Sequence, residues 1–157
     1  SIANYNCPGQ LVIGGEAEAV TKASELALEK GARRAIPLNT SGPFHTELLA
    51  SASNELKEKF VSVNFNEMQV PVIFNSSAKE LESGVSIAQM LEKQVMSSVY
   101  FEDSIRYMLE NGVDTIIEIG PGKVLSGFIR KIDKTIKTYQ VEDQASLEKT
   151  LAGLKGE

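Results

Sequence analysis

The chain has 157 residues, of which 42% are hydrophobic and 24% charged, and its net charge is −5. This composition is typical of a globular protein with an apolar core, and the negative charge argues against general nucleic-acid affinity. The sequence shows no apolar run near the roughly 20 residues of a membrane helix, no signal-peptide pattern at its start, and a single cysteine, which favours a reduced, cytoplasmic compartment.

The first part of the sequence predicts a strand–helix–strand unit over residues 10–38. The apolar run 10–14 ends in paired glycines and predicts a strand. Residues 16–30 carry apolar side chains at steps of three and four, the spacing of one helical face, and Gly31 stands where a helix-ending glycine belongs. Residues 33–38 predict a second strand, at an edge because it contains a proline.

The middle of the chain predicts three helices and one strand. After a loop at 39–44, apolar side chains at helical spacing predict a helix over 46–60. The run 69–74 predicts a strand whose proline places it at an edge or a bulge. Two short helices are expected at 87–95 and 101–110.

The last part of the chain predicts strands that alternate with helices. The apolar run 114–119 predicts a buried strand, and the turn at 120–122 leads directly into a helix over 123–134. A strand at 138–141 and a helix at 146–154 follow. This alternation favours an α/β fold with parallel pairing in the second part of the chain.

The stretch SGPFHT contains His45, the only histidine. One interpretation is an ordinary loop histidine. The other is a general acid–base, because a Gly-Pro pair and a helix start fix the backbone around it, and imidazole exchanges protons near neutral pH. Cys7 is a candidate nucleophile, but a small apolar filler is the more common role for such a residue. The serines lack the G-x-S-x-G turn that presents a nucleophilic hydroxyl.

Three further features have a structural and a functional interpretation. The turn Asn6–Gln10 is either a local turn or part of a cleft. The stretch EIGPGK is a tight strand-to-helix turn or a weak phosphate cradle that lacks P-loop spacing. A basic cluster is either a solvated helix face or a dock for an acidic partner, and its members are Arg130, Lys131, Lys134 and Lys137. One histidine and one cysteine do not suffice for a typical zinc site, so we expect no metal.

Three stretches together resemble the malonyl-CoA:acyl-carrier-protein transacylases of bacterial fatty-acid synthesis, with the acyltransferase domains of polyketide synthases as close cousins. They are NYNCPGQLVIGG, GARRAIPLNTSGPFHTELL and IEIGPGKVLSGFIRKID. The resemblance implies the C-terminal half of the family, because the G-Q-G loop, the G-H-S-L-G-E nucleophile elbow and a carboxylate-binding arginine are missing here. It implies that residues 1–39 are part of a small ferredoxin-like subdomain and residues 40–157 the C-terminal part of a large α/β-hydrolase-like subdomain, with the boundary at the loop 39–41.

The resemblance also implies roles for single residues. His45 matches the histidine that passes the proton in transfer through a serine ester, and the backbone carbonyl of Gln94 matches the group that accepts the other ring N–H. Phe44 resembles the malonyl-selective members, where its ring fills the space of an α-methyl group, and Asn6 matches a residue of the cleft.

The implied function is transfer of a malonyl group from CoA to the phosphopantetheine thiol of acyl carrier protein. Malonyl-CoA is then the substrate, no cofactor is tightly bound, and the partners are acyl carrier protein and the missing N-terminal half. The alternative is a non-catalytic fragment that at most binds acyl carrier protein, which the missing nucleophile favours.

Overall fold

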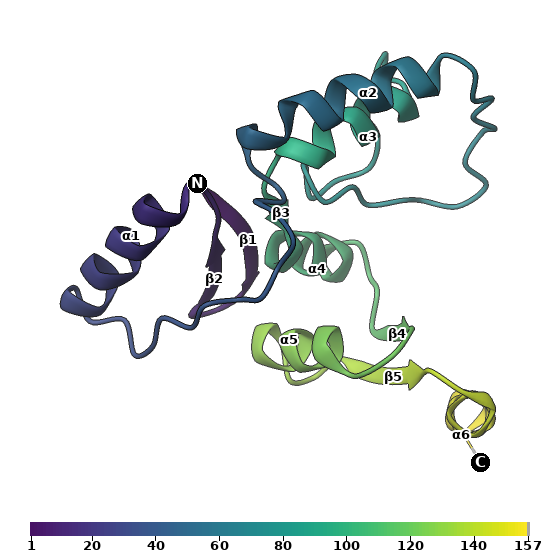
Figure 1. The fold of residues 1–157 in the computed structure, drawn as a ribbon. Coiled ribbons are helices and arrows are strands. Elements are labelled where there is room, and N and C mark those ends of the chain that lie inside the picture. The colour runs from purple at the N-terminus through teal and green to yellow at the C-terminus, as the bar shows by residue number, and fades with distance from the viewer. Residues whose placement is uncertain (157) are drawn as a thin grey trace.

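The computed structural model describes residues 1–156 and contains two small β-sheets with helices beside them (Figure 1). The first sheet has three strands in the order β2-β1-β3. Strands β1 (Ile2–Cys7) and β2 (Gln10–Ile13) form an antiparallel hairpin, and β3 (Val99–Tyr100) pairs parallel to β1. This sheet therefore joins strands from both sides of the loop 39–41.

The second sheet contains β4 (Thr115–Ile119) and β5 (Lys137–Val141), paired in parallel. Helix α5 (Val124–Ile132) connects them, as parallel pairing requires a crossover. The main core lies where α5 meets α4 (Phe101–Glu110) and this sheet. Its buried residues are Ile105, Ile129 and Ile136. The expected parallel α/β arrangement of this region is confirmed.

The remaining helices are α1 (Ala17–Glu29), α2 (Ala50–Phe60), α3 (Ile87–Met96) and α6 (Gln144–Lys155), with a short 3₁₀ turn, η1 (Glu47–Leu49), before α2. Helices α2 and α3 lie side by side (Figure 1). The Ser53 hydroxyl of α2 donates to the Glu92 carbonyl of α3 over 2.9 Å and ties the two helices together. All the helices expected from the apolar spacing are present, with ends shifted by a few residues.

Two expected strands are wrong. Residues 33–38 and 69–74 have no strand structure, apart from an isolated bridge between Phe74 and Lys79. Each segment contains a proline, which lacks a backbone N–H, and neither has a strand beside it to pair with. The expected strand–helix–strand unit over 10–38 therefore lacks its second strand.

Strands β1 and β3 were not predicted. β1 pairs with β2, its neighbour along the chain, and with β3, more than ninety residues away.

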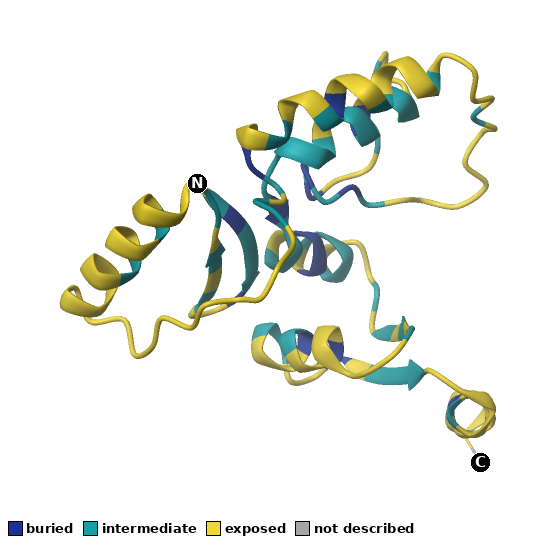
Figure 2. Cartoon of the chain, in the orientation of Figure 1, coloured by how far each residue is buried: buried dark blue, intermediate teal, exposed yellow. Residues whose placement is uncertain are grey.

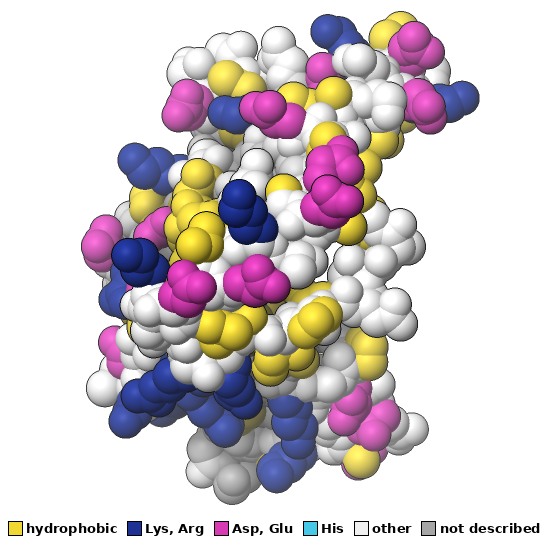
Figure 3. Space-filling model, turned by 60° about the vertical axis from the view of Figure 1, so that its left-hand side comes forward, with side chains coloured by type: hydrophobic (Ala, Val, Ile, Leu, Met, Phe, Trp, Pro, Cys, Tyr) yellow, Lys and Arg dark blue, Asp and Glu magenta, His cyan; other side chains and the backbone are white. Residues whose placement is uncertain are grey.

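The described residues have a large exposed surface, 11197 Å². A compact monomer of 17.1 kDa would expose about 7,800 Å². Helix α1 has no buried residue, and Figure 2 shows it, together with the following loop, largely in the colour of exposed residues. Figure 3 shows hydrophobic side chains spread among the charged ones on the face it presents. No helix within residues 1–156 is long and apolar enough to span a membrane.

Candidate functional site

His45 lies in a strained loop between α1 and α2. Its φ angle is 61°, in the left-handed region that a non-glycine residue rarely adopts. Such a conformation costs on the order of 1–3 kcal/mol and persists only where the surroundings hold it. The Pro43 carbonyl accepts a 2.7 Å hydrogen bond from the hydroxyl of buried Thr46, which closes the loop around His45.

The last turn of α3 holds both the backbone and the ring of His45. The His45 N–H donates to the Val95 carbonyl over 3.2 Å, and His45 Nδ1 lies 3.2 Å from the Gln94 carbonyl oxygen. These carbonyls belong to the last turn of the helix, where the regular i to i−4 hydrogen bonds end, although the Gln94 carbonyl also accepts a long bond of 3.4 Å from the Ser97 N–H. Because a carbonyl only accepts, Nδ1 carries the hydrogen, and the lone pair of Nε2 is then available to accept a proton.

The side chain of Gln94 serves a different purpose. Its Oε1 accepts a hydrogen bond from the Asn75 N–H over 3.3 Å, so it anchors the loop that follows residue 74. The ring of His45 contacts the backbone of Gln94, as the resemblance implies, and the amide side chain supports the surroundings.

The His45 ring opens onto a polar cavity of about 350 Å³. Residues from the C-terminal end of α3, from the segment after it and from η1 line the cavity, among them Glu47, Lys93, Met96, Ser97 and Ser98. Ser97 and Ser98 were considered among the serines of the sequence, but sequence reasoning did not single out Glu47, Lys93 or Met96. Both serine hydroxyls donate to backbone carbonyls, Ser97 to Lys93 and Ser98 to Ile2. Within residues 1–156, His45 therefore has a cavity but no serine nucleophile bonded to it.

Asn6 and Cys7 do not line this cavity. Ser1, which precedes β1, lines the cavity, whereas Asn6 and Cys7 are the last two residues of that strand. Asn6 nevertheless follows Tyr5, whose ring stacks on that of Tyr100, another residue of the cavity lining, with 5.1 Å between the ring centroids. Cys7 is also buried, and this burial raises the pKa of its thiol, which opposes a role as nucleophile.

Phe44 precedes His45, and its side chain is half exposed, at 50%. It is not among the residues that line the cavity at His45. The structure thus brings together His45 and Gln94 of the four residues implied for the site.

The turn EIGPGK is structural in this chain. The carboxylate of Glu118, on β4, accepts hydrogen bonds from Leu125 N–H at 3.0 Å, Ser126 N–H at 2.8 Å and the Ser126 hydroxyl at 2.6 Å. Glu142, after β5, accepts the Gly122 N–H at 2.9 Å. These amides are the donors a phosphate would need, so the tight-turn interpretation is favoured.

The hydrogen bonds at this turn also lower the pKa of the Glu118 carboxyl group. Desolvation by burial raises the pKa of Glu118, but the bonds from Ser126 and Leu125 favour the carboxylate and together outweigh it. The pKa of Glu118 is therefore lowered from its ordinary value of 4.5.

The basic cluster on and after α5 is exposed. The Lys131 ammonium donates to Gln10 Oε1 over 3.1 Å and so braces the β1–β2 hairpin. Within residues 1–156, Arg130, Lys134 and Lys137 form no ion pair. Figure 3 shows Lys and Arg side chains gathered toward one end of the molecule.

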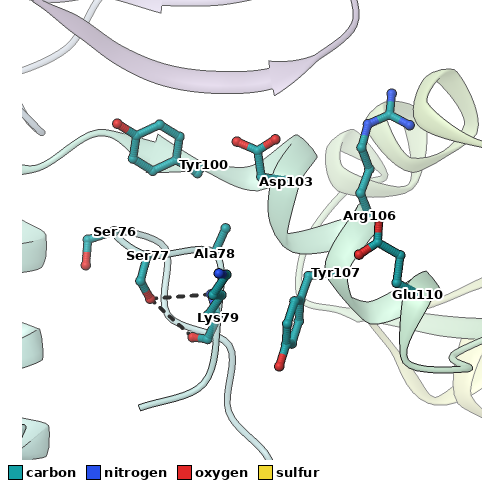
Figure 4. Close-up of a pocket in the computed structure, with 9 residues that line it drawn as sticks. All are labelled: Ser76, Ser77, Ala78, Lys79, Tyr100, Asp103, Arg106, Tyr107 and Glu110. Atoms are coloured by element: carbon teal, nitrogen blue, oxygen red, sulfur yellow. Dashed lines mark hydrogen bonds between the residues drawn. The ribbon is translucent and has the colours of Figure 1, made fainter. Parts of the chain in front are cut away.

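A second cavity, of about 460 Å³, lies between the loop 76–79 and α4 (Figure 4). Asp103, Arg106 and Tyr107 of α4 line it, opposite Lys79. Arg106 is paired with Glu102 at 2.6 Å. Among residues 1–156, no group of three or more His, Cys, Asp or Glu side chains is placed to hold a metal ion.

Comparison with known proteins identifies relatives over almost the whole chain. No protein-family model matches. The malonyl CoA-acyl carrier protein transacylase of Bacillus subtilis is 48% identical over 156 residues, which is 99% of this chain and 49% of that protein. The same-named protein of Staphylococcus aureus is 35% identical over 98% of this chain and 48% of its own length.

Solved structures agree. The transacylase of Clostridium perfringens superposes with a TM-score of 0.95 at 44% identity, over 99% of this chain and 49% of that one. A malonyl-transacylase in complex with a type II PKS acyl-carrier protein superposes with a TM-score of 0.92 at 36% identity, over 100% of this chain and 50% of that one. The predicted resemblance is confirmed, and the chain spans about half the length of the curated relatives it matches.

Proposed function

We propose that this chain is the half of a malonyl-CoA:acyl-carrier-protein transacylase that supplies the general acid–base. The observation that carries the proposal is the His45 ring, held by the Gln94 carbonyl at 3.2 Å with Nε2 free at a polar cavity. Its support from the comparisons is the similarity to proteins of that name over 99% of the chain.

The proton transfers that the resemblance implies are compatible with this geometry. Nε2 of His45 accepts the proton of a serine hydroxyl on the other half as the serine oxygen attacks the malonyl thioester. The imidazolium then protonates the departing CoA thiolate, which leaves malonate esterified to the serine. In the second half-reaction Nε2 takes the proton of the carrier-protein phosphopantetheine thiol. The sulfur attacks the ester, and the proton returns to the serine oxygen.

The exposed surface of the chain is large enough to pack against a further segment, and we propose that this segment is the other half of the transacylase. The described residues expose roughly 3,400 Å² more than a compact monomer of this mass. Obligate interfaces bury about 2,000–5,000 Å² over both partners, so the excess is of the size that a second, intimately packed segment would cover.

The unpaired edge of β4 and several exposed apolar side chains indicate where that segment would pack. Ile119 at the end of β4 is 81% exposed, and Ile36 and Leu38 in the segment expected to be a strand are also exposed. β4 pairs on one side only, with β5. Apolar side chains beside an unpaired strand edge are what an added strand covers. From the resemblance alone we propose that residues 1–39 are part of a small ferredoxin-like subdomain and residues 40–157 the C-terminal part of the large α/β-hydrolase-like one.

A chimera tests the proposal. This chain replaces the matching half of the Bacillus subtilis relative, and transfer of labelled malonate from CoA to holo acyl carrier protein is measured. We expect transfer by the chimera and none by the chain alone. A folded chimera without transfer would refute the proposal, and covalent label on the isolated chain would refute the absence of a nucleophile.

The second candidate function is a non-catalytic fragment that binds acyl carrier protein. The hydroxyls of Ser97 and Ser98, which are engaged by backbone carbonyls in the cavity, favour it for the isolated chain. Titration with acyl carrier protein in rising salt tests binding through the basic cluster, because exposed charge pairs weaken with ionic strength. Binding that is insensitive to salt would exclude the basic cluster, Arg130, Lys131, Lys134 and Lys137, as the docking site.

A further inference from the structure

We propose that Thr46 and Gly14 are positioning residues for His45. Thr46 follows the histidine directly and Gly14 follows β2, so the two meet only in the folded chain. The inference rests on the proposed function for its consequence in catalysis, but the contact and its effect on the ring are testable without any activity.

The first step is the hydroxyl of Thr46. The side chain is 3% exposed, and its hydroxyl donates to the Pro43 carbonyl over 2.7 Å. This bond spans the two residues between Pro43 and Thr46, one of which is His45 at φ 61°. Because the left-handed conformation of a non-glycine residue is disfavoured by itself, a bond that closes the loop across it helps to hold it.

The second step is the methyl group of Thr46. A Cβ atom placed on Gly14 would lie 2.9 Å from Thr46 Cγ2, closer than real carbon contacts allow. Threonine is branched at Cβ and stiff at χ1, and this one is buried, so it has little room to yield. The close approach of Thr46 therefore requires glycine at position 14. Through this contact the end of the β1–β2 hairpin supports the loop that carries His45.

The third step is the consequence for the ring. The loop presents His45 to two successive carbonyls at the end of α3, those of Gln94 and Val95. If the loop relaxes, the ring loses the Gln94 carbonyl, and with it the preference for a hydrogen on Nδ1. Thr46 also borders the cavity at His45, but its hydroxyl donates to the Pro43 carbonyl, so we assign its effect to the position of His45.

The experiment uses the single histidine as its own reporter. The full chain is labelled with ¹⁵N-histidine, and the ring nitrogen shifts are recorded above the titration of the imidazole. In the unchanged chain we expect the hydrogen on Nδ1, opposite to the preference of free histidine. Thr46→Val, which keeps the branched shape and removes the hydroxyl, should reduce the ratio of the two tautomers about 3- to 10-fold, the effect of one lost hydrogen bond. Thr46→Ser should leave it within about twofold of the unchanged chain.

The Gly14 contact has its own test. Gly14→Ala should disturb the ring as Thr46→Val does, and the double variant Gly14→Ala/Thr46→Ser should restore it, because serine has no Cγ2 for the new methyl to meet. Matched controls are Thr21→Val, whose hydroxyl donates to its own helix, and Gly127→Ala, whose added methyl meets nothing within 4 Å.

The outcomes separate the possibilities. An unchanged ring in folded Thr46→Val, a missing Nδ1 hydrogen in the unchanged chain, or no recovery in the double variant overturns the proposal. If Thr46→Val unfolds the chain, the comparison of Gly14→Ala with the double variant Gly14→Ala/Thr46→Ser tests the proposal instead. None of these measurements needs transfer of malonate. The roles of Thr46 and Gly14 can therefore be confirmed even if the proposed function fails, and the proposed function can be confirmed even if these roles fail.

Discussion

Two glycine–proline turns lead into helices in this chain, and they serve opposite purposes. At 120–122 the donors of the turn and of the α5 start are taken up by carboxylates of the same chain, Glu118 and Glu142. At 42–43 the turn holds His45 in a strained conformation, with one ring nitrogen bonded and the other left at a cavity.

The difference shows how to distinguish a structural turn from a functional one. Both have glycine and proline before a helix, so residue type alone does not separate them. What separates them is whether the chain itself satisfies every polar group. The N–H groups of the EIGPGK turn and of the helix start donate to Glu118 and Glu142. In the SGPFHT loop, by contrast, Nε2 of His45 has no hydrogen-bond partner within residues 1–156.

The largest effect is expected at the loop that holds His45. In the chimera, His45→Ala should lower transfer about 10²- to 10⁴-fold, because one general acid–base contributes that much. Transfer of labelled malonate is measured together with thermal unfolding. Glu142→Ala at the other turn is the control and should keep normal transfer, and near-normal transfer by folded His45→Ala would remove the distinction between the turns.

The next effect concerns the stability of the closed turn. Glu118→Ala leaves the N–H groups of Leu125 and Ser126 without their acceptor, and the cost should be about 2 kcal/mol of unfolding free energy. Glu142→Ala, which loses one exposed bond to Gly122, should cost less than about 1 kcal/mol. Urea unfolding of the chimera measures both. Equal losses in the two variants would mean that Glu118 is not the main anchor of α5.

The Glu118 carboxylate also makes the stability of the fold depend on pH. The pKa of Glu118 is lowered by folding, so its stabilising contribution is complete above its unfolded value near 4.5 and is lost as the pH falls through the lower folded value. Urea midpoints between pH 7 and pH 3 should therefore fall less steeply in Glu118→Gln than in the unchanged protein. Parallel curves for the two would contradict the assigned titration.

The smallest effect is expected at the Gln94 side chain. Gln94→Ala keeps the carbonyl that holds the His45 ring and removes only the acceptor of the Asn75 N–H, a long bond of 3.3 Å. Transfer by the chimera should drop about two- to fivefold, with the Nδ1 hydrogen of His45 unchanged in the ¹⁵N spectrum. A loss as large as that of His45→Ala would place the amide itself in the chemistry.

Sequence reasoning located every helix and both strands of the second sheet. Helical spacing of apolar residues is a local property, and β4 and β5 lie in apolar runs bounded by turns. Strands depend on a partner, which local spacing does not describe. For that reason residues 33–38 and 69–74 were expected as strands and are not, and β1 and the two-residue β3 were missed.

By itself the sequence determined where the helices lie, that one histidine follows a rigid turn, and which stretches resemble the transacylases. Only the tertiary structure decided which carbonyls hold the ring, that Asn6 and Cys7 do not line its cavity, and that Gly14 meets Thr46. The physical reason is distance along the chain, since Gly14, His45 and Gln94 are brought together by strand pairing and helix packing that no local pattern encodes.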